Sequence, residues 1–390
     1  MKMSQRRFVL SVALLSLAAS CDALVLLGAG ASFPNWLFQG AADAYLVEKV
    51  SPGVTVSYTS MTSERGHCRI MGWEAECDAD DDAEPRVVDF GATDSLLTEA
   101  EYALYPDLEM YPLAASAVVP IYNLPGFTWE DPPLVLTPGA LSAIFSSNLT
   151  RWDDYRIAVT NPMLAAAGKL QARDIVVVVP SISTGTTEIF KRALRAFDPT
   201  GFGAQVGASP EPDWPGATVV PCDGDPLGIS SCVLATPFSM GFVVLSDVQA
   251  DVLPAVHLLM PGVPTPLRAT VEGAPPRSAR CACPRHPSCC ERATLTVLLP
   301  VQFAAAFSVR NTHAEHRTVD LHDARGLTSW PISGATYLVM RTNTSLFPAN
   351  SGECERRQEV TLFSLSFTLS FYRYPLTHCH IARHVAAKLL

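Results

Sequence analysis

The run DIVVVVPS, from Asp174 to Ser181, constrains the fold more than any other stretch of this sequence. Four consecutive valines leave the strand no polar face, so both of its faces have to be covered. Strands of this kind belong to parallel sheets with helices on both sides. A helical pattern follows at once over residues 182–197. The apolar side chains on its inward face are Ile189, Phe190, Ala193, Leu194 and Phe197.

The same alternation of strand and helix runs through most of the chain. Strand patterns cover residues 54–60, 87–94, 114–124, 239–245 and 335–341, and helical patterns cover residues 35–49, 137–145 and 359–373. The first of these helices places Trp36, Leu37, Ala41, Ala44 and Tyr45 on one face. Thr98 and Glu101 have the spacing of a capping box and open a further helix, and Thr137 followed by Pro138 is a typical helix start. We expect an α/β fold with mainly parallel sheets.

Composition limits the class of partner. The chain has 390 residues, of which 48% are hydrophobic and 17% charged, so it can form two ordinary domains with proper cores. Its formal net charge is −10, which offers no basic face for nucleic acid. A small anion can still bind, because local N–H groups matter more to it than the global field.

The N-terminus has the pattern of a secretory signal. Lys2, Arg6 and Arg7 precede the apolar stretch FVLSVALLSLAAS, and small residues follow it. We expect cleavage near Ala23, so that residues 1–23 form the signal and the remaining chain is exported. The residues that end at Cys21 resemble a lipoprotein box only weakly, because the upstream leucine is misplaced.

An exported chain with ten cysteines after the signal indicates disulfides. Cys68 with Cys77, and Cys222 with Cys232, are the natural local pairs. The sequence does not assign the partners of Cys281, Cys283, Cys289, Cys290, Cys354 and Cys379. Asn148 and Asn343 lie in glycan acceptor sequences, which predicts a glycoprotein if the host is a eukaryote.

No metal or cofactor is expected. His313 with His316 and His378 with His380 lack a nearby carboxylate or third histidine, and we interpret them as solvated. The acidic run from Glu74 to Glu84 lacks the ligand spacing of a calcium loop. Neither nucleotide fingerprint is present, nor are the zinc-protease HExxH and serine-hydrolase GxSxG motifs, so the chain is not expected to be an enzyme.

Three strand-to-helix junctions share one chemistry. They lie at residues 31–33, 59–66 and 181–187, and each is rich in small or hydroxyl residues. In open α/β sheets ligands bind beyond the carboxyl ends of the strands, where the first N–H groups of helices have no partners and attract oxyanions. The competing interpretation is that these serines and threonines are ordinary helix caps.

The order of these pieces resembles the periplasmic phosphate-binding proteins of phosphate ABC transporters, the PstS family. The matching phrases include GAGASFP, YTSMTS, VDFGATD, VVVVPSISTGTTEIF and SWPISGATYLVM. The resemblance implies a two-lobed periplasmic-binding-protein fold of type II, which closes about a hinge on a phosphate held by hydrogen bonds. It places lobe 1 at residues 24–113 and 326–390 and lobe 2 at residues 114–260. Residues 261–325, rich in Cys, Pro and Arg, are then an insertion or loop, or an artefact of the gene sequence.

The resemblance also implies a ligand site. The Ser32 hydroxyl, the Phe33 N–H and Ser63 would bind from one lobe, and Thr184, Gly185 and Thr186 from the other. Asp94 has the position of an acceptor carboxylate. A buried carboxylate selects an anion that still carries a proton, and phosphate does so where sulfate does not.

One departure from the family is large. The family's ligand-binding arginine and the aspartate that tethers it fall on Pro180 and Ile182 in this chain. Our sequence hypothesis is that Arg65 swings into the cleft as a replacement. The alternative is a secreted or cell-surface protein with the same fold but weakened or altered ligand binding and no transport role. For the first interpretation the partner is an ABC-type membrane permease, and for the second a cell-surface partner.

Overall fold

The structure is a computed structural model that describes residues 24–48, 54–72, 88–216, 218–223, 226–250, 253–270, 312–313, 318–319 and 330–341. The expected signal at residues 1–23, Asn343, the helix expected at residues 359–373 and most of the segment 261–325 lie outside these ranges. So do Cys77 and the six cysteines whose partners the sequence leaves unassigned.

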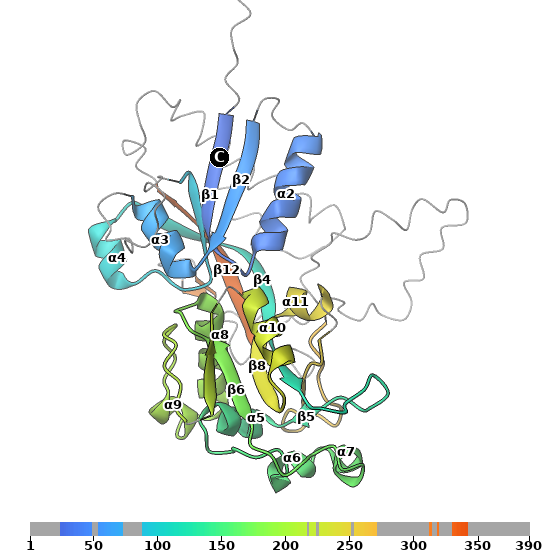
Figure 1. Ribbon diagram of the computed structural model, residues 1–390. Coiled ribbons are helices and arrows are strands. Elements are labelled where there is room, and N and C mark those ends of the chain that lie inside the picture. The colour runs from blue at the N-terminus through green and yellow to red at the C-terminus, as the bar shows by residue number, and fades with distance from the viewer. Residues whose placement is uncertain are drawn as a thin grey trace, which may run out of the picture.

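The N-terminal lobe is built on three parallel strands in the order β2-β1-β3. Its elements are β1 (Leu24–Ala31), α2 (Asn35–Glu48), β2 (Val54–Met61), α3 (Ser63–Met71), β3 (Phe90–Thr93) and α4 (Glu99–Leu104). Figure 1 shows them at one end of the molecule. The core beneath α2 is aromatic, because Phe38 stacks on Tyr58 with ring centroids 4.4 Å apart.

The second lobe is built on β8, β6 and β7, which are also parallel. Its strands are β5 (Val135–Leu136), β6 (Val176–Pro180), β7 (Val219–Cys222), β8 (Ser239–Val244) and β9 (His257–Leu258). Its helices are α5 (Pro138–Phe145), α6 (Tyr155–Ala158), α7 (Pro162–Ala166), α8 (Gly185–Phe197), α9 (Phe202–Gln205), α10 (Pro226–Ala235) and α11 (Leu245–Ala250). Phe190 of α8 stacks on Phe242 of β8 at a centroid distance of 4.3 Å, which fixes that helix on the sheet.

Two long strands join the lobes (Figure 1). They are β4 (Leu108–Asn123) and β12 (Ser333–Arg341), and they pair antiparallel along the first part of β4. β12 also pairs with β3, and the last part of β4 pairs with β8. One mixed eight-stranded sheet therefore runs through both lobes. Trp330, which precedes β12, stabilises the connection to β4 by donating its Nε1–H to the Val118 carbonyl at 3.0 Å.

The expected two-lobed α/β fold is confirmed, with one refinement. The strands are parallel within each lobe, but the three pairs that join the lobes are antiparallel. β4 is also longer than the expected strand at 114–124, since it extends back to Leu108 along β12. The short pair β10 (Thr312–His313) and β11 (Thr318–Val319) completes the described elements. The boundaries expected for the lobes and the insertion stay a prediction. Leu267, inside the expected insertion, forms an antiparallel β-bridge with Leu258 of lobe 2.

The helix starts that were predicted from capping residues are confirmed. Thr98 and Glu101 form the expected capping box, and the Thr137 hydroxyl accepts the Ala140 N–H ahead of Pro138. The face predicted for residues 35–49 is confirmed at Ala41, which packs against the core, whereas Leu37 is only half-buried. The side chains of Trp36, Ala44 and Tyr45 lie outside the described ones. Phe38, which the prediction omitted, is buried at 1% exposure. The cause is the stacking of Phe38 on Tyr58, a contact across two elements that helical spacing cannot reveal.

The expected disulfide between Cys222 and Cys232 is confirmed. It joins the end of β7 to α10 with a Cα–Cα distance of 6.4 Å. Cys68 is also disulfide-bonded. Among the helices of the described ranges, none has both the length and the hydropathy needed to cross a bilayer.

Candidate functional site

The residues singled out in the sequence lie where strands end and helices begin. Ser32 and Phe33 follow β1, Ser63 opens α3 just after β2, and Asp94 follows β3. Thr184, Gly185 and Thr186 stand at the start of α8 in the other lobe. All four junctions therefore lie at carboxyl ends of strands, the edge at which α/β sheets bind ligands.

Two glycines allow the junctions of the N-terminal lobe to lie in direct contact. Gly30 has φ = +142°, and a Cβ placed on it would lie only 1.9 Å from the carbonyl oxygen of Ala92. A Cβ on Gly66 of α3 would lie 2.6 Å from the Gly30 Cα. Backbone packs directly on backbone here, so the ends of β1 and β3 and the first turn of α3 lie within contact of one another.

The two lobes meet at Ser63, Asp94 and Gly185. The Asp94 N–H donates to Ser63 Oγ at 3.1 Å, which joins β3 to α3. A Cβ on Gly185 would lie 2.7 Å from both Asp94 Cβ and Ser63 Oγ. Only a residue without a side chain lets the start of α8 come this close. The structure thus brings together three of the residues that the sequence singled out, one from each of three junctions.

Each helix at this junction begins with backbone N–H groups that have no acceptor in the part of the chain that the structure describes. In α8 the N-cap Thr184 takes the Thr187 N–H on its hydroxyl and the Glu188 N–H on its carbonyl. That leaves the N–H groups of Gly185 and Thr186 without an acceptor among the described residues. The Thr184 hydroxyl itself donates to Thr187 Oγ1 at 2.9 Å, so its side chain serves as a helix cap.

The same pattern recurs in α3. Thr62 receives the Arg65 N–H on its hydroxyl and the Gly66 N–H on its carbonyl. The N–H groups of Ser63 and Glu64 are then the outward donors of α3 within the described part of the chain. Partial positive charge at two helix starts is a suitable seat for an anion.

Asp94 is an unusual carboxyl group. It is 8% exposed, and Thr336 of β12 donates its hydroxyl proton to Oδ1 at 2.6 Å. Burial, opposed by that hydrogen bond and reinforced by the nearby charges of Glu64 and Glu188, raises the pKa of Asp94 to about 8. At neutral pH the group is therefore mainly protonated in the unliganded protein.

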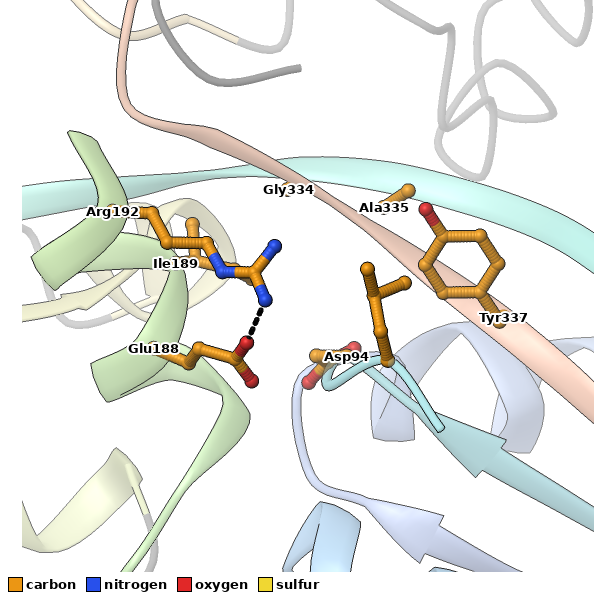
Figure 2. Close-up of a pocket in the computed structure, with 8 residues that line it drawn as sticks. Asp94, Glu188, Ile189, Arg192, Gly334, Ala335 and Tyr337 are labelled. Atoms are coloured by element: carbon orange, nitrogen blue, oxygen red, sulfur yellow. Dashed lines mark hydrogen bonds and ion pairs between the residues drawn. The ribbon is translucent and has the colours of Figure 1, made fainter. Parts of the chain in front are cut away.

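Asp94 also lines a small cavity between α8 and β12. Its volume is about 20 Å³. Figure 2 shows the carboxylates of Asp94 and Glu188 facing each other, with the Arg192 guanidinium paired to Glu188. The lining residues are Asp94, Leu96, Glu188, Ile189, Arg192, Gly334, Ala335 and Tyr337. Glu188 and Arg192 were not among the predicted site residues, because their i, i+4 spacing is equally typical of a solvated pair on a helix.

Other expected site residues are less closely connected. Phe33 is buried and Ser32 half-buried, but neither lines the cavity, and the Ser32 carbonyl accepts the Asn35 N–H at 3.0 Å. Arg65 is exposed on α3 and does not line the cavity either. Pro180 ends β6, and Ile182 is 44% exposed, so neither position supplies a polar side chain to the site. The ligand roles expected for these residues stay predictions.

A buried hydrogen-bond network around His67 fixes the two residues that flank Asp94. His67 Nδ1 lies 3.0 Å from Glu101 Oε1, and its Nε2 lies 2.7 Å from Thr93 Oγ1. Thr93 donates its one hydroxyl proton to the Ser95 carbonyl and accepts the Ser95 N–H. Every acceptor is satisfied when both ring nitrogens of His67 carry protons, which pairs an imidazolium with the Glu101 carboxylate. This network holds the residues on both sides of Asp94.

The described residues contain no group of three or more His, Cys, Asp or Glu side chains arranged to hold a metal ion. What the site offers instead is a set of N–H and O–H donors, a protonatable carboxyl and a guanidinium. This donor set suits a small oxyanion.

Several proteins similar to this chain are named for phosphate binding. Phosphate-binding protein PstS of Methanocaldococcus jannaschii is 30% identical over 59% of this chain and 55% of its own length. Its namesake from Pasteurella multocida is 29% identical over 62% of each chain. The chain thus spans little more than half the length of these relatives. Alkaline phosphatase L of Pseudomonas aeruginosa is also similar, at 27% identity over 69% of this chain and 71% of its own.

The crystal structure of a phosphate-binding protein from Stenotrophomonas maltophilia has the same fold. It superimposes with a TM-score of 0.56 at 18% identity and covers 88% of this chain and 83% of its own. The model of the PBP superfamily domain matches residues 18–271, which include β1 to β9 and every site residue named above except those of β12. The chain belongs to the PBP superfamily.

Proposed function

We propose that this protein is an exported solute-binding protein that captures inorganic phosphate between its two lobes by hydrogen bonds. The observation that carries the proposal is the convergence of two helix starts, α3 and α8, on Asp94. The similar proteins named for phosphate binding support the choice of ligand.

Binding requires the lobes to separate. The cavity beside Asp94 is small, about 20 Å³, and Gly185 lies directly against Asp94 and Ser63, so we infer that the lobes move apart to admit a tetrahedral oxyanion. The start of α8 therefore withdraws, admits the anion and returns until both helix starts donate to it. Closure then excludes water, which strengthens each hydrogen bond in the site.

Asp94 supplies selectivity in this proposal. When the carboxyl is ionised it needs a proton from the ligand, and phosphate has one to give. A buried acceptor left unpaired rejects an analogue strongly, by roughly four to five powers of ten in favourable cases. Sulfate, which carries no proton near neutral pH, is such an analogue.

The site favours binding over hydrolysis. Thr93, His67 and Glu101 have the connectivity of a nucleophile, a base and an orienting carboxylate. The Thr93 hydroxyl, however, is fully buried and donates to the Ser95 carbonyl, so it presents no nucleophile to a ligand. We infer that the phosphatase relative shares the fold rather than a reaction with this chain.

Calorimetry on the purified chain tests the function. At pH 9 phosphate and arsenate should bind, and sulfate should bind far more weakly. Absence of phosphate binding would contradict the proposal and favour the secreted or cell-surface protein with altered ligand. In the cell, the proposal places the protein outside the cytoplasmic membrane, where an ABC-type permease or a cell-surface partner would receive the phosphate.

A further inference from the structure

In the family that this chain resembles an arginine binds the phosphate, and the segment before α8 lacks one. Pro180 and Ile182 stand where the family resemblance places an arginine and its aspartate. Asp94, Glu188 and Glu64 meanwhile bring three carboxyl groups to the region, since the charges of the latter two act on Asp94. A dianion would meet only repulsion from these groups without a nearby positive charge.

The helical repeat of α8 places Arg192 on the side of the helix that faces the site. Gly185, Glu188 and Arg192 are spaced by three and four residues, so they lie along one face. Gly185 touches Asp94 and Ser63, and Glu188 and Arg192 line the cavity that Asp94 shares. Figure 2 shows the ionisable side chains of Asp94, Glu188 and Arg192 around that cavity.

Packing of α8 on β12 fixes this orientation. A Cβ on Gly334 would lie 2.2 Å from Ile189 Cδ1, so the helix rests directly on the strand that joins the lobes. On another face of the helix, Lys191 donates to the carbonyls of Glu211 and Asp213 at 2.6 and 3.0 Å and lies over the Trp214 ring. These contacts leave α8 little freedom to rotate, and Arg192 stays directed toward β12 and Asp94.

Glu188 accepts only one hydrogen bond from the Arg192 guanidinium. The Glu188 side chain is 9% exposed and accepts a hydrogen bond from Arg192 Nη2. The Arg192 side chain is 35% exposed, and its other N–H donors have no partner among the described residues. A guanidinium with donors to spare can hold two oxygens of one oxyanion at once.

We propose that Arg192, positioned by Glu188, is the cationic ligand of the bound phosphate in this protein. It takes the place of the arginine and aspartate missing at Pro180 and Ile182, and it does so from the second turn of α8 instead of from the loop before the helix. The inference rests on the proposed function, because it names a further residue of that site. It competes with the sequence hypothesis that assigns the role to Arg65.

Phosphate calorimetry on four variants tests the inference. Arg192→Ala should weaken binding by at least roughly 10- to 150-fold, the range for each lost charged hydrogen bond. Arg192→Lys should lie between this variant and the parent, because lysine keeps the charge but loses the fork. Arg195→Ala, a matched control on an exposed position of the same helix, and Arg65→Ala should bind within about twofold of the parent.

The possible failures are distinguishable. Phosphate binding by Arg192→Ala at the parent's affinity overturns the inference and leaves the proposed function standing. Loss of binding in Arg65→Ala with Arg192→Ala unchanged assigns the cation to Arg65 instead. No binding by the parent chain overturns both the function and the inference. Circular dichroism melts of all variants, with Arg192→Gln as a second neutral replacement, separate loss of fold from loss of ligand.

Discussion

Gly185 and Asp94 belong to different lobes, yet a Cβ on Gly185 would lie 2.7 Å from the Cβ of Asp94. In the proposed mechanism this contact belongs to the closed state. Because α8 begins at Gly185, the same contact brings the first N–H groups of that helix, which have no acceptor among the described residues, close to Asp94.

Replacing Gly185 with alanine should therefore impair closure. Real Cβ atoms do not approach others at 2.7 Å, so α8 has to retreat from Asp94 and Ser63. Overpacking of this kind costs about 1–3 kcal/mol, and if only the closed state bears it, phosphate affinity falls roughly 5- to 150-fold. Titration calorimetry measures the change.

Gly139→Ala is the matched control for that experiment. It lies in the first turn of α5, and a Cβ there would meet nothing within 4 Å. This variant should bind phosphate like the parent and melt no earlier, since alanine is a better helix former than glycine. Equal affinity for both variants and the parent would show that Gly185 does not set the closed geometry.

Asp94 should make the unliganded protein less stable as the pH rises. Its pKa is raised from the ordinary 3.8 to about 8, chiefly by burial, so between pH 4 and pH 8 the folded state keeps a proton that the unfolded state has released. Stability then falls across that window, because the folded state binds more protons. Asp94→Asn removes the effect while its amide oxygen still accepts from Thr336.

The comparison is a urea unfolding series on phosphate-free protein at pH 4, 6 and 8. The two proteins should differ little at pH 4, and the Asn variant should be more stable at pH 8, by an amount on the order of a few kcal/mol. Parallel stability curves for parent and variant across this range would mean that Asp94 is ionised when buried.

Much of the fold follows from local chemistry that the sequence displays. The valine run predicts β6, and the cap residues Thr98 and Thr137 predict helix starts that the structure contains. The helix starts only at Gly185, instead of at residue 182, because Thr184 is its N-cap. What local patterns could not predict is how β4 and β12 join the lobes, since antiparallel pairing between strands more than 200 residues apart leaves no local signal.

Some residues of the candidate site could likewise be predicted from the sequence, and others could not. Ser63, Asp94 and Gly185 stand out because small and polar residues at strand ends are visible in the sequence. Arg192 and Glu188 do not, since a charged i, i+4 pair on a helix is ordinarily a solvated one. Only the packing of Ile189 against Gly334 shows that this pair faces the cavity beside Asp94.

The His67–Glu101 pair should stabilise the protein above pH 4.5 and lose its effect in acid. Burial alone would raise the pKa of Glu101. The hydrogen bond and the charge of His67 oppose this, and with further hydrogen bonds from Thr98 they lower the pKa from 4.5 to about 2. The stabilisation is complete above the unfolded pKa and disappears as the pH falls from about 4.5 to 2. Glu101→Gln should cost about 1–2 kcal/mol at pH 6, allowing for solvent screening of a partly buried group.

Denaturant unfolding at pH 6 and pH 2.5 checks this expectation. The difference between parent and Glu101→Gln should shrink at the lower pH. Glu130→Gln, in an exposed loop, serves as the control and should leave stability unchanged at both values. A Glu101→Gln effect that is as large at pH 2.5 as at pH 6 would contradict the ion pair.

Selectivity for phosphate over sulfate should increase with pH. Below pH 8 the protonated Asp94 can donate to either anion, because sulfate accepts hydrogen bonds as phosphate does. Above pH 8 the carboxylate can only accept, and phosphate alone still carries a proton to offer. We expect the ratio of sulfate to phosphate dissociation constants to rise at least about tenfold between pH 6 and pH 9, since an unpaired buried acceptor costs about 1–3 kcal/mol. Competition calorimetry gives this ratio, and Asp94→Asn, which cannot ionise, should flatten its pH dependence. A ratio that is constant with pH in the parent chain would remove Asp94 from the recognition of the ligand proton.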